Sequence, residues 1–384
     1  MKKKAIDAFN DASIKVPFII PEITKNDKNA VLNALNSRLL TDGPKLREFE
    51  SIFAKFTGAK FAVGVSNGTA ALQLSLKSIG INYNDEVIIP DITFIATASS
   101  VFNNNAIPVL ADVDEYLNIS IKSMEKKITK KTKEIIPVHF AGKSCDMKKI
   151  MQVARKYKIK VIEDCAHAIG TKFEKNHVGT FGEAGCFSFY PTKNFTTIEG
   201  GMIITNSKKI ADYVRTKRNH GLTKSLIRRY TQGYPWEYDV IEFGYNFRLD
   251  EIRSSLGLSQ LTRVTKLNSL RRKASRYYNL KLRNVEGIST PNISDEDSCH
   301  LYIIRIGKKY KHSRNELYKK LLKNGIQTTV HYKPLHKFSI FKNKKIPIIN
   351  LKNSNQLYNE ILSIPLFPQI TKKEQDWVIN CIIS

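Results

Sequence analysis

One lysine stands where it could act as a nucleophile. Lys193 follows the apolar run Phe187–Tyr190 and Pro191, and the turn Gly200–Gly201 comes shortly after it. A lysine in a partly buried loop loses its proton more easily and can then form Schiff bases. The alternative is an ordinary solvent-facing lysine, in a chain that has many. Aromatic neighbours, in place of a polar helix face, favour the reactive lysine.

A carboxylate and an imidazole form a second candidate pair. Asp164 ends the apolar run Lys160–Asp164, and His167 follows three residues later. A carboxylate at the end of a buried strand requires a cation or a hydrogen-bond donor, because burying it unpaired is costly. The alternative is a helix N-cap beside a packed histidine. The residue types allow both interpretations.

The third candidate is a turn that opens a helix. Gly68 and Thr69 follow the apolar run Phe61–Val65. Free N–H groups at a helix N-terminus bind phosphate well, and glycine lets the backbone approach closely. A plain N-cap would leave the same pattern. Taken together, Lys193, Asp164, Gly68–Thr69 and the aromatic face of Phe94 meet the needs of pyridoxal phosphate, which requires an amine, a carboxylate, a stacking ring and a phosphate cup.

Buried strands must position these residues. Between residues 60 and 205, short apolar runs alternate with helical stretches, which predicts an α/β domain with a mostly parallel sheet covered on both faces. Ligands bind at the carboxyl ends of such strands. After residue 250 the pattern changes to helices near 249–267, 268–283 and 315–324, strands near 300–306 and a last helix from Thr371. We therefore predict a large domain over residues 1–250 and a smaller α+β domain over residues 251–384.

Composition limits the classes of function. The 384 residues include 42% hydrophobic and 25% charged residues, which is ordinary for a globular protein. A net charge of +27 could indicate a polyanion partner, but the basic runs are short and scattered, so we predict no nucleic-acid partner. The five cysteines form no C-x-x-C pair, and we predict no metal site. An odd number of scattered cysteines and the lack of a long apolar run predict a cytoplasmic protein with no membrane partner.

A series of short motifs along the chain resembles the motifs of a known family. The chain resembles the DegT/StrS-type sugar-nucleotide aminotransferases, which are pyridoxal-phosphate enzymes of the aspartate-aminotransferase fold, from about residue 16 to its end. The resemblance rests on nine ordered motifs, at residues 41–44, 67–72, 93–97, 162–168, 188–194, 200–201, 218–221, 244–248 and 331–336. Nine motifs in order along one chain are specific, although several are weak alone.

The resemblance implies roles at the reacting end of the cofactor. Lys193 would be the catalytic residue that binds the cofactor covalently and carries the proton between cofactor and substrate. Asp164 would pair with the pyridine nitrogen, and His167 would lie near the phenolic oxygen. Phe94 would stack on the ring. Relatives that act as dehydratases have histidine in place of this lysine, so Lys193 favours transamination.

The resemblance also implies binding residues around the cofactor. Gly68, Thr69 and Ser188 would hold its phosphate, and Asn246 would reach the phosphate from the partner subunit, so that the site needs a homodimer. The resemblance implies that His331 lies near the nucleotide or sugar, and we add Tyr332, Tyr190 and Arg229 as candidate substrate-binding residues. The alternative for the loop that carries Arg229 is a solvated basic loop at the rim of the dimer.

The implied reaction is the transfer of an amino group from L-glutamate to a nucleotide-linked keto-sugar, at C4 of a 4-keto-6-deoxyhexose. A C3 keto-sugar, or a cyclitol or aminobenzoate-type precursor, would keep the cofactor and change the substrate. A basic nucleic-acid-binding or regulatory protein on the same fold is the alternative from another class. The set of Lys193, Asp164 and Asn246 argues against it, because a repurposed scaffold has no need of a Schiff-base lysine.

Overall fold

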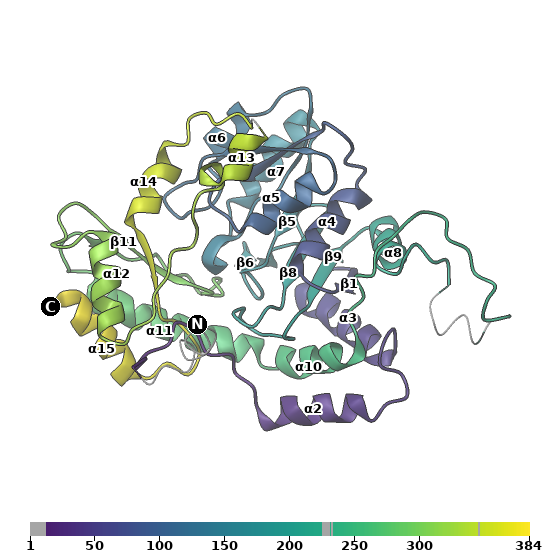
Figure 1. Ribbon diagram of the computed structural model, residues 1–384, viewed down its shortest axis with the longest axis horizontal. Coiled ribbons are helices and arrows are strands. Elements are labelled where there is room, and N and C mark those ends of the chain that lie inside the picture. Colours follow the sequence, from purple (N-terminus) through teal and green to yellow (C-terminus); the bar gives the residue numbers. More distant parts are fainter. Residues whose placement is uncertain (1–12, 225–230, 232, 345) are drawn as a thin grey trace.

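A seven-stranded sheet forms the centre of the larger body in the computed structural model, which describes residues 13–224, 231, 233–344 and 346–384 (Figure 1). The strand order is β1-β9-β8-β5-β4-β2-β3. Strands β8, β5, β4, β2 and β3 pair in parallel, while β9 is antiparallel to both β1 and β8. The predicted mostly parallel sheet is confirmed. The strands are β1 (Phe61–Val65), β2 (Glu86–Pro90), β3 (Ile107–Ala111), β4 (Thr132–Ile135), β5 (Lys160–Asp164), β8 (Ala184–Ser188) and β9 (Gly201–Thr205).

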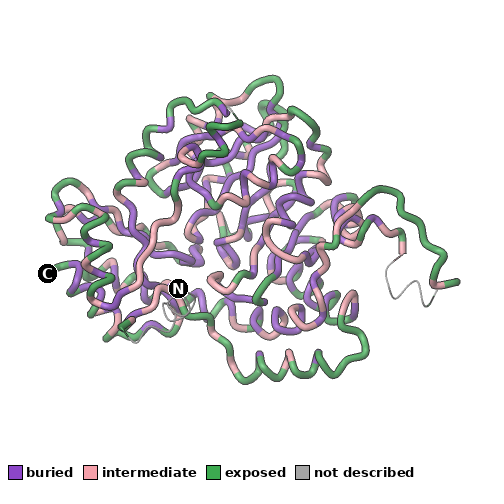
Figure 2. Tube along the Cα trace, viewed as in Figure 1, coloured by how far each residue is buried: buried purple, intermediate pink, exposed green. Residues whose placement is uncertain are grey.

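Helices cover both faces of this sheet. Along β2, Val87 and Ile89 pack in one apolar cluster and Ile88 packs in another. Successive side chains of a strand point to opposite faces, so a strand buried on both sides reads as a continuous apolar run. Figure 2 shows the sheet buried within an exposed outer layer. The helices of this body are α2 (Lys25–Leu35), α3 (Pro44–Thr57), α4 (Gly68–Ser78), α5 (Ile95–Phe102), α6 (Ile121–Lys126), α7 (Met147–Tyr157), α8 (Lys208–Lys217) and α10 (Glu251–Leu261).

A second, smaller body holds most of the C-terminal residues (Figure 1). Its antiparallel sheet has the order β10-β11-β12, and its helices pack with that sheet in one apolar cluster. This is the α+β arrangement predicted for the end of the chain. The elements are β10 (Ile288–Ser289), β11 (Tyr302–Ile306), β12 (Ile361–Ile364), α11 (Val264–Leu282), α12 (Arg314–Lys323) and α15 (Lys372–Ile383).

The chain passes between the two bodies more than once. Val16 packs in the C-terminal cluster, and its N–H donates to the carbonyl of Gly325. In the other direction, Leu335 and Phe341 pack in the cluster of the large sheet. The domain boundary at residue 250 stays a prediction. Wherever the boundary lies, both of these segments pack on the body that the other half of the chain builds.

Several elements of the C-terminal half have no counterpart in our prediction, and helix α14 (Lys352–Glu360) is the longest of them. This helix leads directly into β12, and its N-cap residue, Leu351, offers no side-chain cap. Asp112, just past the end of β3, supplies the cap: its carboxylate accepts from the N–H groups of Asn353 at 2.9 Å and Ser354 at 2.8 Å. Since that partner is distant in the chain, no local signal marks the helix.

Within the described residues, none of the helices combines the length and the apolar character that crossing a membrane requires.

A buried carboxyl group in the sheet lacks a hydrogen-bond partner among the described residues. Glu134 of β4 is fully buried, and neither of its side-chain oxygens is paired. Burial raises its pKa well above the usual 4.5, because desolvation penalises the charged form. The folded protein therefore holds a proton at Glu134 that the unfolded chain releases above about pH 4.5.

The first prediction follows from the raised pKa of Glu134. As the pH rises above 4.5, Glu134 progressively destabilises the fold, because folding must keep or take up the proton. Glu134→Gln should raise the free energy of unfolding by about 1–3 kcal/mol at pH 8, with a smaller gain at pH 5. Urea unfolding at both pH values measures the difference. The exposed Glu48→Gln is the control, and an equal effect of both variants would contradict the prediction.

Candidate active site

A cavity of about 770 Å³ opens at the carboxyl ends of the sheet strands. Nine of the predicted site residues line it, and they come from five separate stretches of the chain. They are Gly68, Thr69, Phe94, Asp164, His167, Ser188, Tyr190, Lys193 and Tyr332. The structure thus brings together most of the residues that the motifs singled out.

Asp164 is held at the last position of β5. Its side chain is 5% exposed, and its carboxylate accepts from the hydroxyl of Thr97 at 2.9 Å and the N–H of Ala166 at 3.1 Å. Burial raises the pKa of Asp164, and these two donors and the nearby Lys193 oppose the rise. A buried carboxyl that faces a cavity is poised to pair with a cation that enters it.

Lys193 lies in the loop after β8, half-buried in the cavity wall. Burial lowers the pKa of its ammonium group to about 8, and the negative charge of Asp164 opposes that shift only in part. Close to neutral pH, a useful fraction of Lys193 is therefore the uncharged amine that attacks carbonyl carbon.

The N-terminus of α4 offers an anion cup. Asn67 caps the helix by accepting from the N–H of Ala70 at 2.8 Å, which leaves the N–H groups of Gly68 and Thr69 without a partner among the described residues. A Cβ on Gly68 would lie 2.8 Å from the Cβ of Ser188, so only glycine lets the strand end come this close. Two free N–H groups and two hydroxyls, those of Thr69 and Ser188, suit a phosphate.

His167 and Tyr332 join across the two bodies of the molecule. The Nε2 atom of His167 lies 3.1 Å from the hydroxyl of Tyr332, and its Nδ1 accepts from the N–H of Ala141 at 3.4 Å. Burial lowers the pKa of His167 well below its usual value, so the ring is neutral. Phe94 is 55% exposed beside this pair, with its ring centroid 5.8 Å from that of Tyr332. An open aromatic face therefore stands at the cavity.

Two predicted residues, His331 and Asn246, are not among the residues that line this cavity. His331 lies behind Tyr332, with its Nδ1 atom 2.9 Å from the hydroxyl of Ser363, and burial lowers its pKa to about 3. Asn246 pairs by a single backbone bridge with Asn219 after α8. Arg229 lies outside the described residues.

Other lining residues carry polar groups that our sequence analysis did not assign. Thr97 stands inside one of the nine motifs, but its bond to Asp164 is visible only in the fold. Glu199 and Arg253 also line the cavity, and Arg253 pairs with Asp250 at 2.6 Å. Neither residue has a local signal that separates it from other surface charges.

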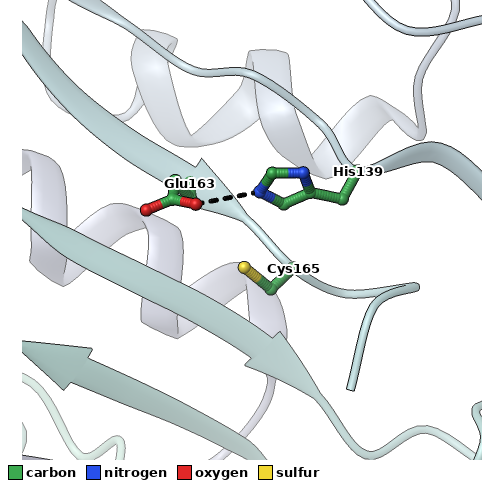
Figure 3. Close-up of side chains that lie close together, drawn as sticks. All are labelled: His139, Glu163 and Cys165. Carbon is green, nitrogen blue, oxygen red and sulfur yellow. Dashed lines mark hydrogen bonds and ion pairs between the residues drawn. The ribbon is translucent and has the colours of Figure 1, made fainter. Parts of the chain in front are cut away.

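His139 forms a buried cluster with Glu163 and Cys165, the two chain neighbours of Asp164 (Figure 3). These types can bind a metal, but the carboxylate of Glu163 and the ring of His139 are already engaged. Glu163 accepts from the ring of His139 at 3.0 Å and from the N–H groups of Gly179, Phe181 and Gly182. Burial also raises the pKa of the Cys165 thiol well above its usual value, which opposes the thiolate that a metal needs. The cluster therefore stabilises the turn before β8.

A lysine, a buried carboxylate, an open aromatic ring and an anion cup at the strand ends form the arrangement of a pyridoxal-phosphate enzyme, and the donor set fits that cofactor. Comparison with known proteins agrees. The model of the DegT/DnrJ/EryC1/StrS aminotransferase family matches residues 21–383, and the chain belongs to this family. It is a pyridoxal-phosphate-dependent sugar aminotransferase.

Relatives extend over nearly the whole chain. The spore coat polysaccharide biosynthesis protein SpsC of Bacillus subtilis is 37% identical over 373 residues, 96% of each chain. PseC of Helicobacter pylori, an aminotransferase involved in the biosynthesis of pseudoaminic acid, is 30% identical with a TM-score of 0.89, covering 96% of this chain and 98% of its own. The protein Spr1654 of Streptococcus pneumoniae, named a sugar aminotransferase and solved in its pyridoxamine-phosphate form, is 30% identical with a TM-score of 0.90 and the same coverage.

The second prediction concerns the amine of Lys193. Only the neutral amine reacts, so the rate at which the apoprotein forms its visible band with pyridoxal phosphate should rise with pH and level off above about pH 8. Stopped-flow absorbance from pH 6 to 10 measures this rate. Lys193→Ala should form no band. A rate that keeps rising toward the ordinary lysine value of 10.5 would contradict the lowered pKa.

Proposed function

We propose that this enzyme transfers the amino group of L-glutamate to a nucleotide-linked keto-sugar, at C4 of a 4-keto-6-deoxyhexose. The observation that carries the proposal is the cavity in which Lys193 and Asp164 face the anion cup of Gly68, Thr69 and Ser188. The named roles of PseC and SpsC in sugar and polysaccharide biosynthesis support a sugar substrate.

The residues around the cavity divide the work. Pyridoxal phosphate, when bound, supplies an electron sink for the carbon that carries the amine. Asp164, held by Thr97 and Ala166, would pair with the pyridine nitrogen and favour its protonated form through charge attraction. The Nζ atom of Lys193 accepts the proton from the substrate carbon and returns it, which its pKa of about 8 permits close to neutral pH.

Binding groups would hold the substrate in place. We assign Phe94 to the ring face of the cofactor and His167 to its phenolic side, with Tyr190 and Tyr332 near the sugar. His331 supports Tyr332 from behind, and Arg229 is a candidate for the nucleotide diphosphate. The net charge of +27 favours an anionic substrate. Because the chain belongs to an aminotransferase family, we prefer the enzyme to the nucleic-acid-binding alternative.

We also propose that two copies share the site. Asn246 does not line the cavity of its own chain, and large apolar side chains in the segment before it are exposed, with Phe243 91% exposed and Trp236 70% exposed. Exposed apolar residues of this size are typical of a contact between subunits. All five cysteines are unpaired, which supports a reducing compartment, the cytoplasm.

The third prediction tests the reaction. L-Glutamate should convert the visible band of the loaded enzyme to the shorter-wavelength pyridoxamine form, and a nucleotide-linked 4-keto-6-deoxyhexose should restore it. Lys193→Ala should lose both steps by at least a thousandfold, whereas the exposed Lys209→Ala should keep them. Restoration by a 3-keto-sugar or a cyclitol ketone, but not by the 4-keto-sugar, would replace the proposed substrate. A band that ignores glutamate would replace the donor.

The fourth prediction tests the shared site. Asn246→Ala should weaken retention of the cofactor, because one phosphate contact is lost. Mixed dimers of Asn246→Ala and Lys193→Ala chains should recover part of the activity, since one of the two sites then has both residues intact. Tagged co-expression and steady-state assay measure the recovery. Its absence would show that each site is built from one chain.

A further inference from the structure

The segment that carries Tyr332 into the cavity is tied to the end of β2. Asp91, the residue after β2, is fully buried, and its carboxylate accepts from the backbone N–H of His336 at 3.0 Å. The ring Nδ1 of His336 lies 2.7 Å from the second oxygen of that carboxylate. The carbonyl of Asp91 accepts from the N–H of Leu335 at 2.8 Å. Three polar contacts thus converge on one residue of the large body.

The other ring nitrogen of His336 is also engaged. Its Nε2 atom lies 3.2 Å from the side-chain oxygen of Asn355 in α14. The orientation of that amide is set by its nitrogen, which donates to the carbonyl of Leu351 at 3.0 Å. His336 is therefore held at both ends of its ring, and the ring cannot turn without losing two contacts.

This tie joins two walls of the cavity. Phe94 lies three residues after Asp91, and Tyr332 lies four residues before His336; both line the cavity. Their ring centroids are 5.8 Å apart. Only a few residues of irregular chain separate each ring from the Asp91–His336 contact, so this contact sets the positions of Phe94 and Tyr332.

We propose that Asp91 and His336 are positioning residues for the reaction: their contact sets the distance between Phe94 and Tyr332, and through Tyr332 it sets the place of His167. The inference rests on the proposed use of this cavity for pyridoxal phosphate. Asp91 and His336 do not line the cavity, so they act through the two rings.

A second tie on the same segment provides a matched control. The Asp112 carboxylate accepts from the backbone N–H of Ser354 at 2.8 Å and from its hydroxyl at 2.9 Å. It holds α14 on the end of β3, and neither Asp112 nor Ser354 lines the cavity. Losing this tie should weaken the docking of α14 but leave the three contacts of Asp91 in place, so Phe94 and Tyr332 should keep their positions.

The fifth prediction uses the visible circular dichroism of bound pyridoxal phosphate, which reports the asymmetric surroundings of the ring. Asp91→Asn and His336→Gln should lower the band at least twofold at full cofactor loading and raise the KM for L-glutamate more than they lower kcat. His336→Asn should keep most of the band, because the asparagine nitrogen replaces the histidine Nδ1 donor. Asp112→Asn should lower the melting temperature and leave the band unchanged.

The outcomes separate the two proposals. An unchanged band in Asp91→Asn, or an equal loss in Asp112→Asn, would overturn the positioning role. Equal losses in His336→Asn and His336→Gln would overturn the part assigned to the Nδ1 contact. A wild-type protein that forms no band would overturn the proposed use of the cavity and this inference with it.

Discussion

The burial of the Asp164 carboxylate is the constraint on which the site depends. A charged oxygen at the end of a strand buried on both faces requires donors, and the fold supplies them from Thr97 and Ala166. Each oxygen of this carboxylate can accept a further hydrogen bond, and a group that enters the cavity can supply it. The same burial lowers the pKa of Lys193, so one dry environment prepares both the carboxylate and the amine.

Acidic residues mark three of the parallel strand ends, and they have two different roles. Asp164 at the end of β5 faces the cavity, while Asp91 after β2 and Asp112 after β3 bind the segment that follows Tyr332. The carboxyl ends of parallel strands lie along one edge, so these side chains share a surface. The edge that binds the ligand also docks the chain that closes the ligand's cavity.

The fold and the core of the site could be predicted because their signals are local. Apolar runs mark buried strands, and the Asn67 cap with Gly68 marks the helix that forms the anion cup. Helix α14 could not be predicted, because its cap comes from Asp112, more than two hundred residues away. The Thr97 contact and the His336 tie have the same origin: they exist only once distant strands lie side by side. The role given to His331 rests on the resemblance alone.

The two ties on the returning segment also bear on how sequences of this kind can diverge. Between His336 and Ser354 the chain is held at both ends, and much of the described chain between them is exposed, including Ile340, Ile348 and Ile349. Insertions or deletions there should not change the position of Tyr332, because the contacts of His336 and Ser354 hold the chain at both ends. This stretch is therefore where evolution can lengthen or rewrite the surface of the enzyme while its chemistry stays in place.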